Sequence, residues 1–106
     1  ADILSNQGIN ARVVDLKTVK PIDWATIEKT VDDCGRILIV SEDRFHGGIG
    51  PTISAHIARN MFDYLDAPLQ LLTALDSRVA YGIDGDEACL PSVTKIVNQA
   101  ETLVEY

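Results

Sequence analysis

Residues Gly35 to Ala58 read GRILIVSEDRFHGGIGPTISAHIA and decide the fold class of this chain. Ile37 to Val40 is an unbroken apolar run, which is typical of a strand covered on both faces and therefore of a parallel sheet. The polar stretch Ser41 to Gly50 contains three glycines and reads as a loop. Pro51 opens a helix that we expect to reach about Tyr64. Its apolar residues recur four apart at Ile53, Ile57 and Met61.

Strands and helices alternate on both sides of this segment. Before it, Ile9 to Leu16 alternates in polarity and predicts a strand, and Asp23 to Asp33 predicts a short amphipathic helix that ends near Gly35. After it, Leu69 to Thr73 predicts a third strand, and Ser92 caps a final helix with an apolar stripe. The alternation indicates a layered α/β domain with a mostly parallel sheet and right-handed crossovers.

The remaining elements lie at the two ends of this core. Ala1 to Gln7 is typical of the last turn of a helix closed by Gly8. Leu75 to Pro91 is expected to be a long acidic connection.

Length and charge exclude several classes of protein. The 106 residues suit one domain with one core. Sixteen acidic and nine basic residues give a net charge of −7, which would repel a nucleic acid backbone and suits a basic protein partner. No apolar run approaches the ~20 residues of a membrane helix, and Ala1 to Asn10 lacks the features of a secretory signal, so we expect an intracellular protein. Cys34 and Cys89 are expected to be buried or half-buried free thiols.

The glycine loop is the most informative candidate site. A helix start after a strand can bind phosphate, but the glycine spacing matches neither nucleotide-binding fingerprint, and Glu42 and Asp43 oppose an anion. We therefore expect the glycines to permit close backbone approach where the loop meets another surface. His46 in this loop is a candidate base without a recognisable nucleophile beside it. His56 is expected to pack on its helix.

Two acidic groups allow a functional and an ordinary interpretation. Asp84, Asp86 and Glu87 do not have the ligand spacing of a calcium loop, so we expect a solvated loop. Asp63 and Asp66 are expected to close the helix that begins at Pro51, where negative charge opposes the helix dipole. Such a placement favours recognition of a basic partner, although chance exposure remains the alternative.

Four segments together resemble one family over nearly the whole chain. They read GINARVVDLKTVKPID at Gly8 to Asp23, the segment Gly35 to Ala58 quoted above, FDYLDAPLQLLTALDSRVAY at Phe62 to Tyr81, and LPSVTKIVNQA at Leu90 to Ala100. The first two resemble transketolase-type carboxy-terminal domains. The last two are similar, more specifically, to beta subunits of pyruvate and branched-chain 2-oxoacid dehydrogenases. Arg78 and Ala80 depart from this pattern, because family members usually have a proline-rich turn there.

The resemblance implies a fold and a role. The fold is a single domain over residues 1–106, with three α/β/α layers and a mixed, mainly parallel five-stranded sheet whose first strand lies before Ala1. The parent enzyme decarboxylates a 2-oxoacid and acylates a lipoyl group. It uses thiamine diphosphate and Mg, held between the alpha subunit and the preceding beta-subunit domain. The resemblance assigns no catalytic, cofactor-binding or metal-binding residue to this domain, and it implies a location in the cytoplasm or mitochondrial matrix.

The resemblance also implies two contact surfaces. One is a loop against the alpha and beta subunits of the same enzyme, formed by Arg44, Phe45, His46, Gly47, Gly48 and Gly50. The other is a docking point for the basic subunit-binding domain of the lipoyl acyltransferase, formed by Asp66 and the carboxylate of Tyr106. No nucleic acid or membrane partner is implied.

Two alternatives remain open. The chain could belong to a transketolase or a deoxyxylulose phosphate synthase, in which a GDG cofactor motif would lie upstream on the same polypeptide. It could also be a stand-alone α/β binding module, which would fold alone as a monomer. The 2-oxoacid itself is not indicated, because its pocket is expected outside these residues.

Overall fold

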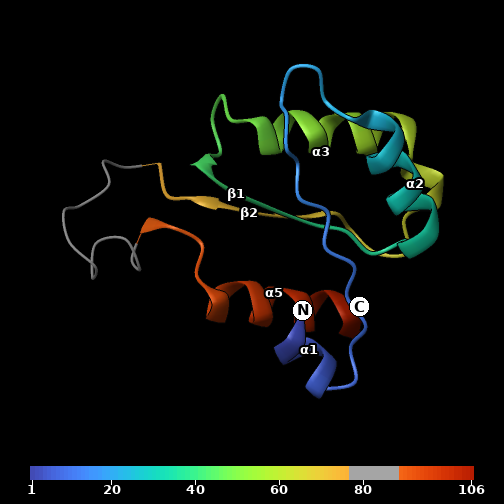
Figure 1. Ribbon diagram of the computed structural model, residues 1–106, viewed down its shortest axis with the longest axis vertical. Helices are drawn as coiled ribbons and strands as arrows, with labels where there is room; N and C mark the ends of the chain where they lie inside the picture. Colours follow the sequence, from blue (N-terminus) through green and yellow to red (C-terminus); the bar gives the residue numbers. More distant parts are fainter. Residues whose placement is uncertain (77–88) are drawn as a thin grey trace.

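The structure is a computed structural model that describes residues 1–76 and 89–106 of the chain (Figure 1). Its helices and strands follow one another along the chain as α1 (Asp2–Asn6), α2 (Trp24–Cys34), β1 (Leu38–Arg44), α3 (Ile49–Asn60), the short 3-10 helix η1 (Phe62–Tyr64), β2 (Gln70–Ala74) and α5 (Val93–Glu105).

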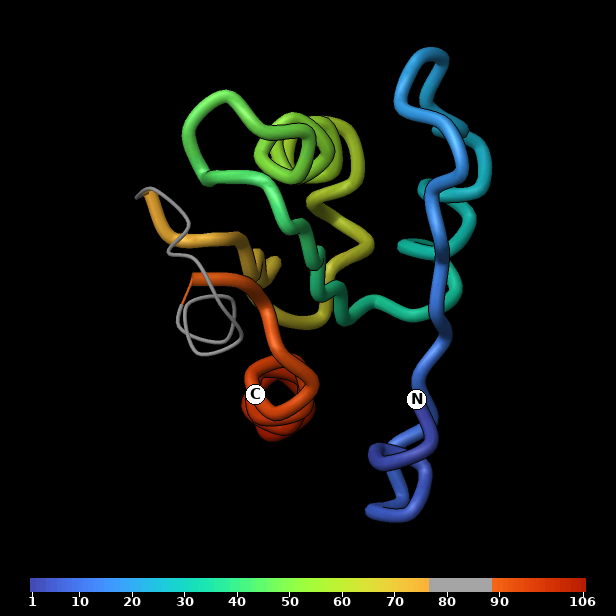
Figure 2. The backbone as a smooth tube through the Cα atoms, turned by 60° about the vertical axis from the view of Figure 1, so that its left-hand side comes forward, coloured from blue at the N-terminus to red at the C-terminus, as the bar shows by residue number. Residues whose placement is uncertain are grey.

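Three layers are built around a parallel pair of strands. β1 and β2 pair in parallel, with Leu38 opposite Gln70 and Val40 opposite Leu72. α3 covers one face of the pair and α5 covers the other, as Figures 1 and 2 show. The predicted α/β/α layering with a parallel sheet is confirmed. The sheet has two strands within the described residues, fewer than the five that the resemblance implies.

The principal core lies between α2 and α3. Ile27 and Val31 on α2 meet Ile53 and Ile57 on α3, and all four side chains are buried. Their spacing of four residues places each pair on one helix face, as the sequence predicts. Aliphatic side chains therefore join α2 to α3, and α3 in turn packs on β1 and β2.

Both ends of α2 are capped by residues that the sequence identifies. The Asp23 carboxylate accepts a hydrogen bond from the Thr26 amide at 3.1 Å, which satisfies one of the free amides of the first turn. Gly35 ends the helix in the left-handed conformation, with φ of 69°. Ser92 caps α5 in the same way as Asp23, through the Lys95 amide at 3.2 Å.

The strand predicted at Ile9 to Leu16 is wrong. This segment has no strand pairing, and Figure 2 shows it running apart from β1 and β2. Val13 is 72% exposed, so the alternating pattern does not cover one face. A strand requires a neighbour for its backbone groups, and within the described residues none lies beside this segment. It is held instead by Leu16, which packs against the core, and by Arg12, which bonds Asp33 at 2.7 Å.

Other boundaries differ by a few residues. β1 continues to Arg44, which takes four residues from the predicted loop, and α3 begins at Ile49 and ends at Asn60. Val40 is 42% exposed, so the expectation that both faces of the central strand are covered is only partly met. Cys34 is exposed, contrary to expectation, and Cys89 is buried.

Four of the elements were predicted closely. α1 closes before Gly8, which has φ of 79°. α2, β2 and α5 lie within about one residue of the sequence expectation. The expectations for Arg78, Ala80, Asp84, Asp86 and Glu87 lie outside the described residues.

Candidate functional site

The parallel strands give the domain two ends, which carry different predicted contact residues. The carboxyl end carries Phe45 to Gly48 after β1 and Leu75 with Asp76 after β2. The amino end carries the residues that precede β1 and β2, and the C-terminus of α5 lies there too because α5 runs antiparallel to the strands (Figure 1). The predicted contact loop and the predicted docking residues therefore lie at opposite ends.

At the carboxyl end, His46 joins the loop after β1 to Asp76, the second residue after β2. Its Nδ1 contacts the Asp76 carboxylate, and its side chain is 82% exposed. The Phe45 ring meets the His46 ring edge to face, with 5.4 Å between centroids, and Phe45 is 54% exposed. These two rings form the exposed tip of the loop.

Glycine is required at two positions of this loop. Gly47 has φ of 77°, a conformation that side chains disfavour. A Cβ at Gly48 would collide with the carbonyl oxygen of Arg44, because the chain folds back on itself there. Gly50 lies inside α3, where a Cβ would approach Leu71 Cδ1 to 3.0 Å. The glycines thus set the loop shape and the close packing of α3 on the sheet.

At the end of β1, the side chains of Ser41 and Asp43 make local hydrogen bonds to the backbone. Ser41 Oγ accepts from the Asp43 amide at 3.2 Å, and Asp43 Oδ1 accepts from the Arg44 amide at 2.8 Å. No side chain caps the start of α3. The Asp43 carboxylate lies beside the loop where a phosphate group would have to approach, which disfavours an anion. The arrangement is suited to contact with a protein surface through Phe45 and His46.

At the amino end, Asp66 is held against the C-cap of α2. Its amide donates to the Gly35 carbonyl at 2.8 Å, and its carboxylate lies over the Gly35 Cα, where a Cβ would come 2.7 Å from Asp66 Cγ. Arg36 Nη1 lies 3.8 Å from Asp66 Oδ2. The helix expected to close at Asp63 and Asp66 ends earlier, at Asn60, so the predicted conflict with the helix dipole is wrong.

One other carboxylate at the end of α2, that of Asp33, is paired. Asp33 bonds Arg12 at 2.7 Å and lies 3.4 Å from Lys29 Nζ. The hydrogen bond from Arg12 holds the pKa of Asp33 below its usual value, and the same bond raises the pKa of Arg12. Asp33 is therefore paired with Arg12 and Lys29, whereas the Asp66 side chain is 63% exposed.

Tyr106, the second predicted docking residue, is 74% exposed at the end of α5. The middle of this helix is tied to the start of β2 by a hydrogen bond from Gln99 Nε2 to Gln70 Oε1, at 2.6 Å. Because α5 runs antiparallel to the strands, Tyr106 lies at the end of the domain where β1 and β2 begin, and Asp66 precedes β2 at that end (Figure 1).

His56 has a structural role, as predicted. Its ring stacks on Trp24 with 3.9 Å between centroids, and Nε2 lies 2.9 Å from Glu28 Oε1. All three side chains link α2 to α3 beside the core.

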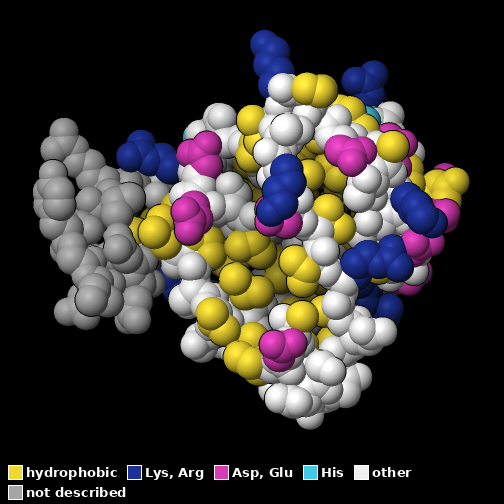
Figure 3. Space-filling view, in the orientation of Figure 1, with side chains coloured by type: hydrophobic (Ala, Val, Ile, Leu, Met, Phe, Trp, Pro, Cys, Tyr) yellow, Lys and Arg dark blue, Asp and Glu magenta, His cyan; other side chains and the backbone are white. Residues whose placement is uncertain are grey.

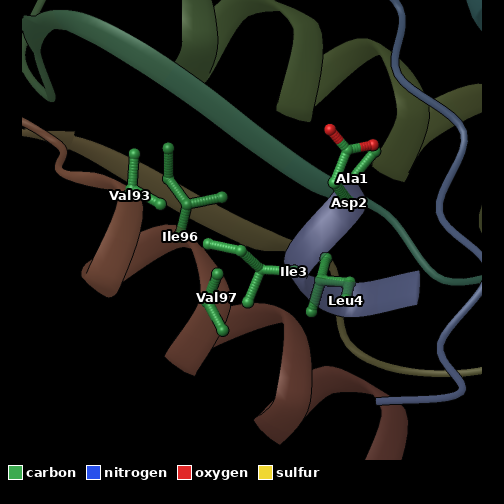
Figure 4. A pocket seen from close by; sticks show the side chains of 7 residues that line it. All are labelled: Ala1, Asp2, Ile3, Leu4, Val93, Ile96 and Val97. Atoms are coloured by element: carbon green, nitrogen blue, oxygen red, sulfur yellow. The ribbon is translucent and has the colours of Figure 1, made fainter. Parts of the chain in front are cut away.

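Two surface hollows do not fit a thiamine diphosphate site. The larger, of about 270 Å³, lies between α1 and α5 and is apolar except for Asp2 (Figure 4). It continues an apolar surface visible in the middle of Figure 3. The smaller, of about 140 Å³, contains Asp15, Asp23 and a lysine that pairs with Asp15. Neither offers unpaired cations for a diphosphate, and no group of three metal-binding side chains converges within the described residues.

A protein family matches this architecture. The family described as "Transketolase, C-terminal domain" matches residues 1–96. The chain belongs to this family. Its relatives include the pyruvate dehydrogenase E1 component subunit beta of Rickettsia bellii, 39% identical over 98 residues, and the mitochondrial subunit beta of Dictyostelium discoideum, 34% identical over 105 residues. These alignments cover 92% and 99% of the chain but 30% of each relative, so the chain spans about a third of their length.

The fold brings together two pairs of ionisable side chains that sequence analysis missed. Asp76 approaches His46, and Arg36 approaches Asp66. Each pair follows from the parallel pairing, because equivalent ends of neighbouring parallel strands meet at one edge. The sequence did contain a signal for these pairs, because Asp76 follows one strand and Arg36 precedes the other.

Within the described residues, no helix is both long and apolar enough to cross a bilayer.

Proposed function

We propose that the chain is the carboxy-terminal assembly and docking domain, over residues 1–106, of the beta subunit of a thiamine-diphosphate-dependent 2-oxoacid dehydrogenase of the pyruvate type. The observation that carries the proposal is that relatives named as pyruvate dehydrogenase beta subunits align with 92% to 99% of this chain. The parent enzyme decarboxylates a 2-oxoacid and acylates a lipoyl group. It works in the cytoplasm, or in the mitochondrial matrix if the source is eukaryotic.

The cofactor belongs to other parts of this enzyme. Thiamine diphosphate supplies the carbanion chemistry of decarboxylation when it is bound with Mg. The described residues lack the cationic cradle and carboxylate cluster that such a group requires. In this proposal the domain contributes position and contacts, and no catalytic, cofactor-binding or metal-binding role is assigned to its residues.

The carboxyl end of the domain contacts the alpha and beta subunits of the same enzyme. Phe45 supports this assignment, because a large aromatic ring at an exposed loop tip is typical of an interface. Arg44 and His46 supply the polar rim of the contact, and Gly47, Gly48 and Gly50 set the shape of the loop.

The amino end of the domain docks the basic subunit-binding domain of the lipoyl acyltransferase component. Asp66 presents an exposed carboxylate on a fixed backbone, and Tyr106 presents an exposed ring. The net charge of −7 favours encounter with a basic partner. Because docking and subunit contact use opposite ends of the strands, both can occur at once.

The test is Asp66→Lys in the complete enzyme. We expect weaker docking of the acyltransferase subunit-binding domain, by roughly an order of magnitude or more at low salt, and nearly unchanged decarboxylation of the free 2-oxoacid. Asp63→Lys is the matched control, since it makes the same charge change on exposed η1 without altering Asp66. Unchanged docking of the Asp66→Lys enzyme at low salt, measured by titration calorimetry, would refute the docking role.

A further inference from the structure

Asp66 is positioned by the residues that end α2 and lead into β1. The hydrogen bond from its amide to Gly35 fixes its backbone, and the absence of a side chain at Gly35 leaves room for its carboxylate. The carboxylate is therefore presented from a rigid corner where the chain leaves α2.

Arg36 is a cation built into the same corner. Its Nη1 lies 3.8 Å from Asp66 Oδ2, which is beyond hydrogen-bonding distance but within ion-pair range. The Arg36 side chain is 40% exposed, so water reaches the pair. Asp33, in the last turn of α2, is already engaged by Arg12 and Lys29. Among the described residues, Arg36 makes its single ion pair with Asp66.

We propose that Arg36 is a specificity-determining residue that lowers the affinity of the Asp66 corner for a basic protein partner by competing for the same carboxylate. This inference rests on the proposed docking role of Asp66. An incoming Lys or Arg must approach a carboxylate that is partly neutralised, and it is repelled by the guanidinium beside it. The loose geometry of the Arg36 pair leaves Asp66 oxygens open to the partner, so the contact attenuates docking without blocking it.

The chemistry sets the direction and size of the effect. Exposed charge pairs contribute a few tenths to about 1 kcal/mol, which corresponds to about a two- to fivefold change in affinity. Removing the charge of Arg36 should tighten docking by that factor at low salt. This gain in docking affinity should shrink as the salt concentration rises, because salt screens exposed charges. If Arg36 only stabilised the corner, removing its charge would weaken docking instead.

The test compares Arg36→Gln with Arg36→Lys in the complete enzyme, using the purified subunit-binding domain of the acyltransferase as the titrant. Arg36→Gln removes the charge and keeps a long polar side chain, whereas Arg36→Lys keeps the charge. We expect about two- to fivefold tighter docking for Arg36→Gln and little change for Arg36→Lys. In an Asp66→Asn background, the gain from Arg36→Gln should fall because the attracting carboxylate is absent.

The outcomes separate this inference from the docking role itself. If Asp66→Lys weakens docking while Arg36→Gln leaves it unchanged or weakens it, the competition is refuted and the docking role stands. If Asp66→Lys has no effect, the docking role fails and the competition fails with it. Equal unfolding midpoints for the Arg36 variants and the parent enzyme would show that any affinity change is not due to misfolding.

Discussion

Replacing Gly35 with alanine tests the corner on which both α2 and Asp66 depend. Gly35 has φ of 69°, and a Cβ added there would lie 2.7 Å from Asp66 Cγ, well inside van der Waals contact. Gly35→Ala therefore imposes two separate costs, one from the backbone conformation and one from displacement of the carboxylate.

The two costs can be estimated separately. A left-handed conformation costs a residue with a Cβ roughly 1–2 kcal/mol relative to glycine. The Asp66 side chain is short and 63% exposed, so it can rotate away, at up to about 1 kcal/mol if it leaves its preferred rotamer. We expect a total loss of about 2 kcal/mol or slightly more in unfolding free energy. This is a large part of the 5–15 kcal/mol that typically stabilises a domain.

Gly47→Ala is the matched control, because Gly47 has a similar φ of 77° and an added Cβ would meet none of the described residues within 4 Å. Urea denaturation followed by circular dichroism gives the unfolding free energy of each variant. We expect Gly35→Ala to cost more than Gly47→Ala, and the difference to disappear when Asp66 is also replaced by alanine.

Two results would refute this reasoning. Equal losses for the Gly35 and Gly47 variants would show that the Asp66 carboxylate does not occupy the space above Gly35. A Gly35→Ala variant as stable as the parent would show that the left-handed cap of α2 does not form.

Two further predictions concern the core and the acid stability of α2. Ile57→Ala should lower the unfolding free energy by about 2–5 kcal/mol because the side chain is fully buried. Val104→Ala, at an exposed position, should change the unfolding free energy by less than about 0.5 kcal/mol. Similar losses for the two variants in urea denaturation would contradict the core assignment. Hydrogen bonds from the Thr26 hydroxyl and amide lower the pKa of Asp23, so its contribution is complete above about pH 4 and is lost as the pH falls through the lowered pKa. Asp23→Asn keeps a capping oxygen but does not titrate, so its stability should depend less on pH in that range, and an unchanged acid dependence would contradict the role of Asp23.

The corrections to the sequence expectations share one cause. Ile9 to Leu16 has the alternating pattern of a strand, yet pairing depends on another strand lying beside it, and the described chain places none there. Asp63 and Asp66 were expected in the last turn of a helix that ends at Asn60 instead. In both places the local pattern was not enough: for Ile9 to Leu16 it did not contain a neighbouring strand, and for Asp63 and Asp66 it did not contain the residue at which α3 ends.

The sequence by itself determined the helices with clear caps, the parallel character of the sheet, and the family to which the chain belongs. These features depend on local spacing: Asp23, Gly35 and Ser92 act on their own helix ends, and the aliphatic residues of α2 and α3 recur within a few positions. Tertiary structure alone decided which charges meet. Arg36 and Asp66 are thirty residues apart, as are His46 and Asp76, and each pair came together only because β1 and β2 align their equivalent ends.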